Sequence, residues 1–252
     1  MADDGVLEVL HGVASEIRRS LEGLDDWGLA GTREGQYRSD LVADRVALDM
    51  FEQAGFGVFS EESGIHNPDR AITVVIDPVD GSTNAAHGLP WWATSLCAID
   101  ADGPLAAVVV NQATGTRYEA YRGEGAHCDG QPITPSLATS LHESIVALNG
   151  YPAKYLGWSQ FRCLGAAALD LCAVASGRLD AFIDCGWTSL APWDYLGALL
   201  VCQESGAHVV EAFGRDLVVL QPGERRTVVA GATLQLLDEA VTARNSLEPR
   251  TV

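Results

Sequence analysis

Apolar residues recur at helical spacing near the start of the chain and in several later segments. Residues 5–22 carry valine, leucine and isoleucine every three or four positions, which predicts an amphipathic first helix. Residues 39–54 predict a second helix, followed by Gly55 in the position where glycine commonly closes a helix. Three further helices are predicted at residues 165–177, 194–206 and 233–245.

Short apolar runs between these helices predict strands. The run GVFS at residues 57–60 is the first, and AITVVI at 71–76 is continuously apolar and β-branched, as expected of a strand buried on both faces. From residue 92 to 133, short runs broken by turn signals predict an antiparallel meander, with the glycines at 123–125 in a hairpin turn. Later strands are predicted at residues 178–184, 207–213 and 226–232.

The alternation of these elements predicts an α/β (α+β) protein in two tightly joined halves. Residues 1–135 would form an N-terminal half with a large antiparallel sheet, and residues 136–252 a C-terminal α/β half. The boundary is placed where the composition shifts, near residues 132–140. A chain of 252 residues is long enough to bury roughly 70–75% of its unfolded surface in such a fold.

The charge and composition exclude several classes of partner. The formal net charge is -18, so nucleic acid and anionic membranes would be repelled, and an anionic substrate would need a cation to approach. The first residues lack a basic segment and a long apolar core, which argues against a signal peptide, and no run of about 18 apolar residues predicts a membrane span. The six cysteines show no CxxC spacing, and most of them are expected to be small core residues of a cytoplasmic protein.

Two carboxylates, Asp77 and Asp80, follow the second apolar run in the stretch IDPVDGSTN. Pro78 fixes φ and is expected to end the strand ladder, and Gly81 permits a tight bend, so the turn can bring both carboxylates toward one point. Neighbouring carboxylates repel unless they share a proton or a cation. Oxygen ligands favour Mg²⁺, with Ca²⁺ or Mn²⁺ behind it. A solvated turn is the alternative interpretation of this stretch.

Other acidic motifs do not explain the stretch, and other acidic residues add to it. The twelfth position from Asp77 is Gly88 instead of the glutamate of an EF-hand, and the DxxD spacing is not that of a DxD phosphatase loop. Glu61 and Glu62 stand at the end of a predicted strand, where an exposed acidic turn would be the plain interpretation. Asp194 opens a predicted helix, where a helix-capping role is also expected.

Taken together, these segments resemble the inositol monophosphatase family, part of the superfamily that includes fructose-1,6-bisphosphatase. The stretch DPVDGSTN at residues 77–84 is similar to the family's DP(I/V)DG(S/T)TN motif. SEES at 60–63 and WD at 193–194 are similar to its (G/S)EES and second WD motifs. The resemblance runs through roughly residues 37–231. Further matches are the hairpin at residues 123–130 and the R-x-x-G-(S/T)-A-A stretch at residues 162–180.

This resemblance implies a layered α/β/α/β/α sandwich, usually a homodimer, that hydrolyses small phosphate monoesters with two or three Mg²⁺ per active site. It also implies inhibition by Li⁺. Inositol 1-phosphate is the first expected substrate, and fructose-1,6-bisphosphate, histidinol phosphate and 3′-phosphoadenosine 5′-phosphate are alternatives with the same chemistry. The alternative from another class is a catalytically silent relative that serves as a metal-dependent binding protein.

The resemblance also implies which residues hold the metal ions. Glu61, Asp77 and the carbonyl of Val79 would hold the first Mg²⁺, and Asp77, Asp80 and Asp194 the second. Glu61 would assist with a third ion. Two such ions can activate a water and stabilise the leaving alkoxide in an in-line displacement, without a covalent nucleophile.

Roles in catalysis and substrate binding follow from the same motifs. Ser82 matches the hydroxyl that, with Asp44, polarises the attacking water, and Glu61 is expected to take part in catalysis. The amides of Gly81 and Ser82 would meet the phosphate at the start of a helix. Substrate contacts are implied for Asp80, Gly81, Ser82, Thr83, Gly165, Ala167, Asp184 and Asp194.

The chain departs from the family pattern on the substrate side. Ala85 stands where the family usually has an aromatic residue, and Ala166 replaces the Ser/Thr of the G-(S/T)-A motif. Asp184 is one methylene shorter than the usual glutamate, and about three extra residues separate it from Asp194. Arg38 stands where the first Asp of D-x-V-T-x-x-D would fall. None of these changes removes a metal ligand, so the alcohol specificity is open.

Overall fold

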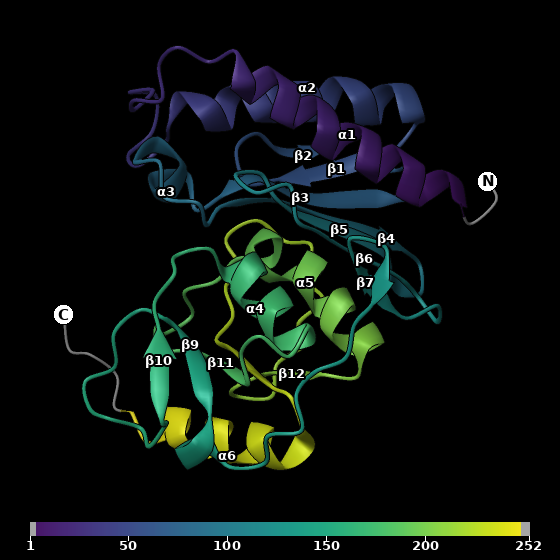
Figure 1. Ribbon diagram of the computed structural model, residues 1–252. Helices are drawn as coiled ribbons and strands as arrows, with labels where there is room; N and C mark the ends of the chain where they lie inside the picture. The colour runs from purple at the N-terminus through teal and green to yellow at the C-terminus, as the bar shows by residue number, and fades with distance from the viewer. Residues whose placement is uncertain (1–3, 248–252) are drawn as a thin grey trace.

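The computed structural model describes residues 4–247, which form five layers of helices and sheets (Figure 1). Two helices lie on one face of a large sheet, and two more lie between that sheet and a small one. A last helix covers the far face of the small sheet (Figure 1). In this order the helices are α1 (Asp4–Glu22), α2 (Arg38–Ala54), α4 (Ala167–Ala175), α5 (Pro192–Ser205) and α6 (Leu234–Asn245). The predicted layered α/β/α/β/α fold is therefore confirmed.

The large sheet has eight strands in the order β2-β1-β3-β4-β5-β6-β7-β8. The strands are β1 (Gly57–Ser60), β2 (Gly64–His66), β3 (Thr73–Asp80), β4 (Ala93–Asp100), β5 (Gly103–Asn111), β6 (Arg117–Tyr121), β7 (Ala126–Cys128) and β8 (Gln131–Pro132). The β1–β3 pair is parallel, and the other neighbours are antiparallel, so the predicted meander is confirmed as β4 to β8. Glu204 of α5 accepts hydrogen bonds from the amides of Gly123 and Gly125, which holds the predicted hairpin turn.

Strand β3 corrects the expectation that Pro78 ends the ladder. The strand continues to Asp80, because the missing proline N–H falls in a β-bulge where the ladder needs no donor. Asp77 is paired with Ser95 of β4 and Asp80 with Ala93, so β3 has one extra residue over this interval. Residues three apart normally face opposite sides of a strand, and the extra residue turns both carboxylates to the same face.

The small sheet has five strands in the order β10-β9-β11-β13-β12. The strands are β9 (Ile145–Asn149), β10 (Gln160–Arg162), β11 (Ala181–Asp184), β12 (His208–Glu211) and β13 (Val228–Gly231). The sequence predicted β11, β12 and β13 but missed β9 and β10, because one is a short apolar run and the other is an exposed edge strand. The helices α3 (Ser82–Ala86) and η1 (Leu141–Glu143) complete the fold.

The core follows the predicted hydrophobic pattern. Val6, Leu10, Val13 and Ile17 of α1 are buried against the large sheet. Five of the six cysteines are buried, as expected of small core residues, and Cys163 is exposed. Within residues 4–247, no helix is long and apolar enough to cross a membrane.

A close approach between α6 and the small sheet gives a first testable prediction. A Cβ added at Gly231 would lie 2.6 Å from the amide nitrogen of Leu237 in α6, so Gly231→Ala must push the helix away. We expect a loss of about 1–3 kcal/mol in the free energy of unfolding, measured by urea denaturation.

The matched control is Gly12→Ala in α1. Its added methyl would meet only Met50 Cε at 3.6 Å, an ordinary contact. This variant should gain about 0.5–1 kcal/mol, because alanine loses less chain entropy in a helix. Equal unfolding midpoints for the two variants would contradict the close packing of α6.

Candidate metal centre

Three carboxylates from distant parts of the chain meet at one end of the large sheet. One oxygen each from Glu61, Asp77 and Asp194 lies within 4.8 Å of the other two. Strands β1 and β3 are parallel, with Ser60 opposite Ile76, so the next residues, Glu61 and Asp77, lie side by side just beyond the last β1–β3 pair. The amide of Glu61 donates to the carbonyl of Ile76 at 3.2 Å, which holds this register. The structure therefore brings together three of the predicted metal ligands.

Asp194 reaches the cluster from the first turn of α5. The sequence suggested a helix-capping position, but the residue before the helix is Ala191, and Asp194 lies in the third helical position. Its Oδ2 accepts a hydrogen bond from the amide of Ala191 at 2.7 Å, so the side chain bends back over the helix start. Pro192 at the first helical position suits this geometry because its missing N–H would have no partner there. The carboxylate is thus held in one orientation.

Asp80 faces the same side of the large sheet as Asp77, but its carboxylate is hydrogen-bonded to a different helix from the one that carries Asp194. The bulge in β3 turns it toward α4, where its Oδ2 accepts a hydrogen bond from the amide of Ala168 at 2.8 Å. It is buried and close enough to Asp194 to raise the pKa of that carboxyl. Val79, predicted to contribute its carbonyl, is buried between the two aspartates, and its amide donates to Asp77 Oδ1 at 3.0 Å.

Burial and mutual repulsion raise the pKa of every carboxyl in this group. Loss of hydration is the largest cause in each case, and it raises the pKa of Glu61 and Asp80 to about 8 and that of Asp194 to about 7. The pKa of Asp77 lies well above its usual value, first through burial and then through Glu61 and Asp80. Four such groups cannot all be ionised without a compensating cation. The oxygen-only donor set therefore fits a hard divalent cation.

Asp44 acts on this site through Ser60. The hydroxyl of Ser60 donates to Asp44 Oδ1 and accepts from the amide of Glu62, which fixes the backbone on both sides of Glu61. The sequence reasoning quoted Ser60 only as part of a motif and missed this bridge. Within residues 4–247, no hydrogen bond joins Asp44 to Ser82, and their joint action on a water remains a prediction.

A loop before α2 closes over the end of β1. Arg33 forms an ion pair of 3.0 Å with Glu62 and donates to the carbonyl of Glu61 at 3.3 Å. Gln36 also donates to the carboxylate of Glu62. The positive charge of Arg33 is therefore already balanced by Glu62, although it lies next to the metal centre.

Gly81 and Gly165, both expected near the substrate, lie together. Gly81 has φ of +85°, and a Cβ there would lie 3.0 Å from the carbonyl oxygen of Gly165, so only glycine fits the turn into α3. Asn84 Nδ2 donates to the carbonyls of Trp91 and Leu164, each at 2.7 Å, and so ties the two halves of the chain together. The role of Asn84 could not be predicted from the sequence, because one of its partners, Leu164, is 80 positions away.

The other expected substrate residues are placed around this turn. Ser82 opens α3, and Thr83 accepts a hydrogen bond from the hydroxyl of Tyr37 at 3.3 Å. Ala167 begins α4, next to the amide that binds Asp80. Their contacts with a substrate remain predictions.

Asp184 is fully buried, and its carboxylate is already bound by the chain itself. Ser189 Oγ donates to it at 2.7 and 2.8 Å, the amide of Gly186 at 2.9 Å and Asn149 Nδ2 at 3.0 Å. These bonds fold the insertion between Asp184 and Asp194 back on itself. A direct contact of Asp184 with substrate remains a prediction, and its first role is to hold this loop.

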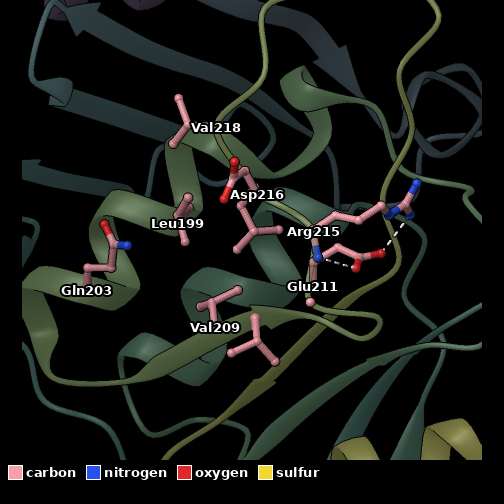
Figure 2. A pocket seen from close by; sticks show the side chains of 10 residues that line it. Leu199, Gln203, Val209, Glu211, Arg215, Asp216 and Val218 are labelled. Atoms are coloured by element: carbon pink, nitrogen blue, oxygen red, sulfur yellow. Dashed lines mark hydrogen bonds and ion pairs between the residues drawn. The ribbon is translucent and has the colours of Figure 1, made fainter.

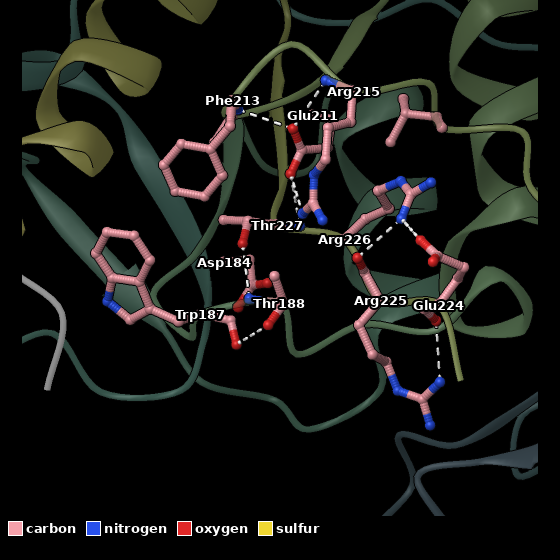
Figure 3. A network of polar contacts seen from close by, with 12 residues as sticks. Asp184, Trp187, Thr188, Glu211, Phe213, Arg215, Glu224, Arg225, Arg226 and Thr227 are labelled. Carbon is pink, nitrogen blue, oxygen red and sulfur yellow. Dashed lines mark hydrogen bonds and ion pairs between the residues drawn. The ribbon is translucent and has the colours of Figure 1, made fainter. Parts of the chain in front are cut away.

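The tip of the insertion packs on α6. Arg244 donates from Nε to the carbonyl of Asp184 at 2.7 Å, and its guanidinium lies 4.5 Å from the ring centre of Trp187. Trp187 stacks on Phe213 with ring centres 5.3 Å apart, and Figure 3 shows both rings beside the polar network. The extra residues are thus an ordered loop.

One arginine missed by the sequence reasoning lies beside the metal centre. The guanidinium of Arg225, between β12 and β13, lies 5.3 Å from the ring centre of Trp193. Trp193 precedes Asp194 and packs edge-on against Phe59, with ring centres 5.2 Å apart. Arg225 also lowers the pKa of Asp194, against the larger effect of burial. Figure 3 shows its side chain directed away from that of Arg226.

The hollow beside α5 is separate from this centre. It has a volume of about 570 Å³ and lies between α5, β12 and the residues after that strand (Figure 2). Leu199, Gln203, Val209 and Val218 are among the side chains that line it, and none of its lining residues is a predicted metal ligand.

The fold and the site define a class of layered α/β proteins that gather buried carboxylates at strand and helix ends to hold divalent cations. The model of the inositol monophosphatase family matches residues 40–247. The chain belongs to this family.

Relatives and solved structures agree with this assignment. A Methanocaldococcus jannaschii protein named fructose-1,6-bisphosphatase/inositol-1-monophosphatase is 28% identical over 79% of this chain and 81% of its own length. The Escherichia coli protein named Nus factor SuhB is 32% identical over 69% of this chain and 71% of its own length. The structure of the extragenic suppressor protein suhB from Bartonella henselae superposes with a TM-score of 0.80 at 27% identity, covering 96% of this chain and 99% of that one.

The raised pKa values predict how the metal-free protein responds to pH. Between about pH 4 and 8 the folded protein retains protons that the unfolded chain has already lost, so rising pH disfavours the folded state. In EDTA, the melting temperature should therefore fall as the pH rises from 5 to 8. The fall should be smaller with saturating Mg²⁺, and smaller for Asp77→Asn, which removes one carboxylate from the cluster.

Asp69→Asn is the matched control, because Asp69 is exposed in the turn before β3. In EDTA, the melting temperature of Asp69→Asn should depend on pH in the same way as that of the wild type. Parallel melting profiles for Asp77→Asn and Asp69→Asn would contradict the proposed repulsion in the cluster.

Proposed function

We propose that this protein is a divalent-metal-dependent phosphatase that hydrolyses a small phosphate monoester, with inositol 1-phosphate as the first candidate substrate. The observation that carries the proposal is the convergence of Glu61, Asp77 and Asp194, whose oxygens lie within 4.8 Å of one another, with Asp77 buried and the other two partly buried. Membership of the inositol monophosphatase family supports phosphatase chemistry in general. The name of the Methanocaldococcus relative supports inositol and fructose phosphates as substrates to test first.

Mg²⁺ is the cation we propose, in two or three copies held by the carboxylates and by the carbonyl of Val79. When bound, it supplies the positive charge that offsets the phosphate and acidifies a water. The strongly acidic composition makes this charge necessary, since an anionic ester would otherwise be repelled. Inhibition by Li⁺, a homodimer and a cytoplasmic location belong to the same proposal, on the resemblance to the family.

The residues of the chain would hold and orient the reactants. We assign to Ser82 and Asp44 the positioning of the water whose oxygen joins the phosphorus while the ester bond breaks and the alcohol takes up a proton. Glu61 would accept a proton from this water once bound cations hold its carboxylate in the ionised form. The amides of Gly81 and Ser82, with Thr83, Gly165 and Ala167 nearby, would contact the phosphate and the alcohol.

A second candidate function rests on the relatives named Nus factor SuhB. Their printed name is that of a factor and not of a phosphatase, and at 32–33% identity it supports the binding protein without turnover as the alternative. The departures around Ala85 and Ala166 favour it, and the complete set of metal ligands disfavours it. Turnover on a phosphate ester decides between the two.

Phosphate release tests the proposal directly. The wild type should release phosphate from inositol 1-phosphate or fructose-1,6-bisphosphate with Mg²⁺ and lose this activity in EDTA. Asp77→Asn should lower kcat/KM on the order of 100-fold or more, because it removes a metal ligand. Ser82→Ala should lower kcat by roughly 100-fold or more while Mg²⁺ still binds, because only water positioning is lost.

Asp69→Asn provides the control for the loss of one carboxylate and should keep wild-type turnover. The proposal fails if Asp77→Asn and Asp69→Asn release phosphate at the same rate. A wild type that binds Mg²⁺ and turns over no ester in a broad panel would favour the binding protein instead.

A further inference from the structure

The positive charges near the metal centre are not equivalent. Within residues 4–247, two arginines are described beside the carboxylate cluster, Arg33 and Arg225. Arg33 is paired with Glu62 at 3.0 Å, so its charge is already balanced. Arg225 forms no ion pair with any residue of 4–247, and its one hydrogen bond described there goes to the carbonyl of Glu224 at 3.0 Å.

The neighbouring residues explain why Arg225 stays unpaired. The carboxylate of Glu224 pairs with Arg226 at 2.5 Å, so the acidic side chain next to Arg225 already has a partner. Arg226 also donates to the carbonyl of Asp216. Arg226 is buried, whereas Arg225 is only partly buried. Figure 3 shows the two guanidinium groups on opposite sides of the loop. Other arginines of residues 4–247, such as Arg45 and Arg162, also form no ion pair, but Arg225 is the unpaired one described beside the carboxylate cluster.

Aromatic packing holds this unpaired charge near the metal ligands. The guanidinium lies over the face of Trp193, 5.3 Å from the ring centre, which is a stabilising cation–π geometry. Trp193 is in turn fixed by its edge-on contact with Phe59, two residues before Glu61. The next residue after Trp193 is the ligand Asp194, whose carboxyl is close enough to feel the positive charge of Arg225. The charge is therefore positioned beside the cluster by Trp193 and Phe59, which lie one and two positions from predicted metal ligands.

We propose that Arg225 forms an anion subsite beside the metal centre and selects phosphate esters that carry a second anionic group. A guanidinium with free N–H donors binds phosphate and carboxylate groups through charge-assisted hydrogen bonds. Bound metal ions would neutralise the reacting phosphate, and Arg225 is then the cation left for a second anion. This inference rests on the proposed function and names the class of substrate for the same site.

The test compares two pairs of compounds that differ only in the second anion. Fructose-1,6-bisphosphate is compared with fructose 1-phosphate, and 3-phosphoglycerate with glycerol 3-phosphate, each with Mg²⁺. Arg225→Met keeps an apolar stem against Trp193 and removes the charge. It should lower the kcat/KM ratio within at least one pair by roughly 10- to 100-fold, the loss expected for one charge-assisted contact.

Two further variants separate binding of the anion from a structural role. Arg225→Lys keeps the charge and should restore part of the ratio. Arg70→Met removes an exposed charge at the turn before β3, at the opposite end of that strand from Asp80, and should leave both ratios at wild-type values. A loss confined to the fructose pair identifies a second phosphate as the preferred anion, and a loss confined to the glycerol pair identifies a carboxylate.

Two results would overturn the inference. Unchanged ratios in Arg225→Met would exclude the subsite, and an equal loss for all four compounds would mean that Arg225 only supports the fold around Trp193. If the wild type releases no phosphate from any compound, the proposed function fails. The four compounds are then stable in solution, and calorimetric titration into the Mg²⁺-loaded protein still decides whether Arg225→Met weakens binding of the doubly anionic member of each pair.

Discussion

The repulsion between buried carboxylates at the end of β3 is the constraint on which the rest of this site depends. Asp77 and Asp80 face the same layer only because a β-bulge adds one residue to β3 opposite β4. Burial then removes the water that would screen their charges and raises the pKa of the carboxyls around them. Four carboxyl groups gathered in this way do not stabilise the fold, since each costs free energy to bury. Bound cations would offset this free energy of burial and repulsion, and the four carboxylates would then form their binding site.

The surrounding fold holds the carboxylates against their repulsion. Three of them accept hydrogen bonds from backbone amides, Asp77 from Val79, Asp80 from Ala168 and Asp194 from Ala191. Asp44 anchors the end of β1 through Ser60, and the paired sheet strands fix the register beneath. The site is thus preorganised by bonds that do not depend on the metal. This rigidity suits a reaction in which positioning and charge are the main contributions of the protein.

Much of the fold could be predicted from the sequence, because local patterns encode it. The spacing of Val6, Leu10, Val13 and Ile17 indicates a helix with one buried face, and the structure buries those residues. The bulge in β3 could not be predicted in this way, since it depends on pairing with β4 and a proline within a strand normally indicates its end. Strands β9 and β10 escaped prediction because they are short and lack a clear alternation.

The metal ligands were predicted from motifs, and their neighbours were not. A motif identifies residues such as Asp77 or Asn84, but it does not show which residues far along the chain form hydrogen bonds with them. The bond from Asn84 to Leu164 spans 80 positions, and Ser60 and Asp44 are 16 apart. The position of Arg225 beside the cluster could not be predicted from the sequence, because it depends on contact with Trp193, which lies next to Arg225 only in the folded protein.

The measurement that tests this account most directly is calorimetric titration of Mg²⁺ at pH 7 in two buffers of different ionisation enthalpy. The carboxyls of Glu61 and Asp80, with pKa values of about 8, hold protons at this pH when no metal is bound. Binding must displace them, so the account predicts that at least one proton is released to the buffer and that release diminishes as the pH approaches 9. Binding with the same apparent enthalpy in both buffers would mean that no proton is displaced, and would contradict the claim that buried, mutually repelling carboxylates create the site.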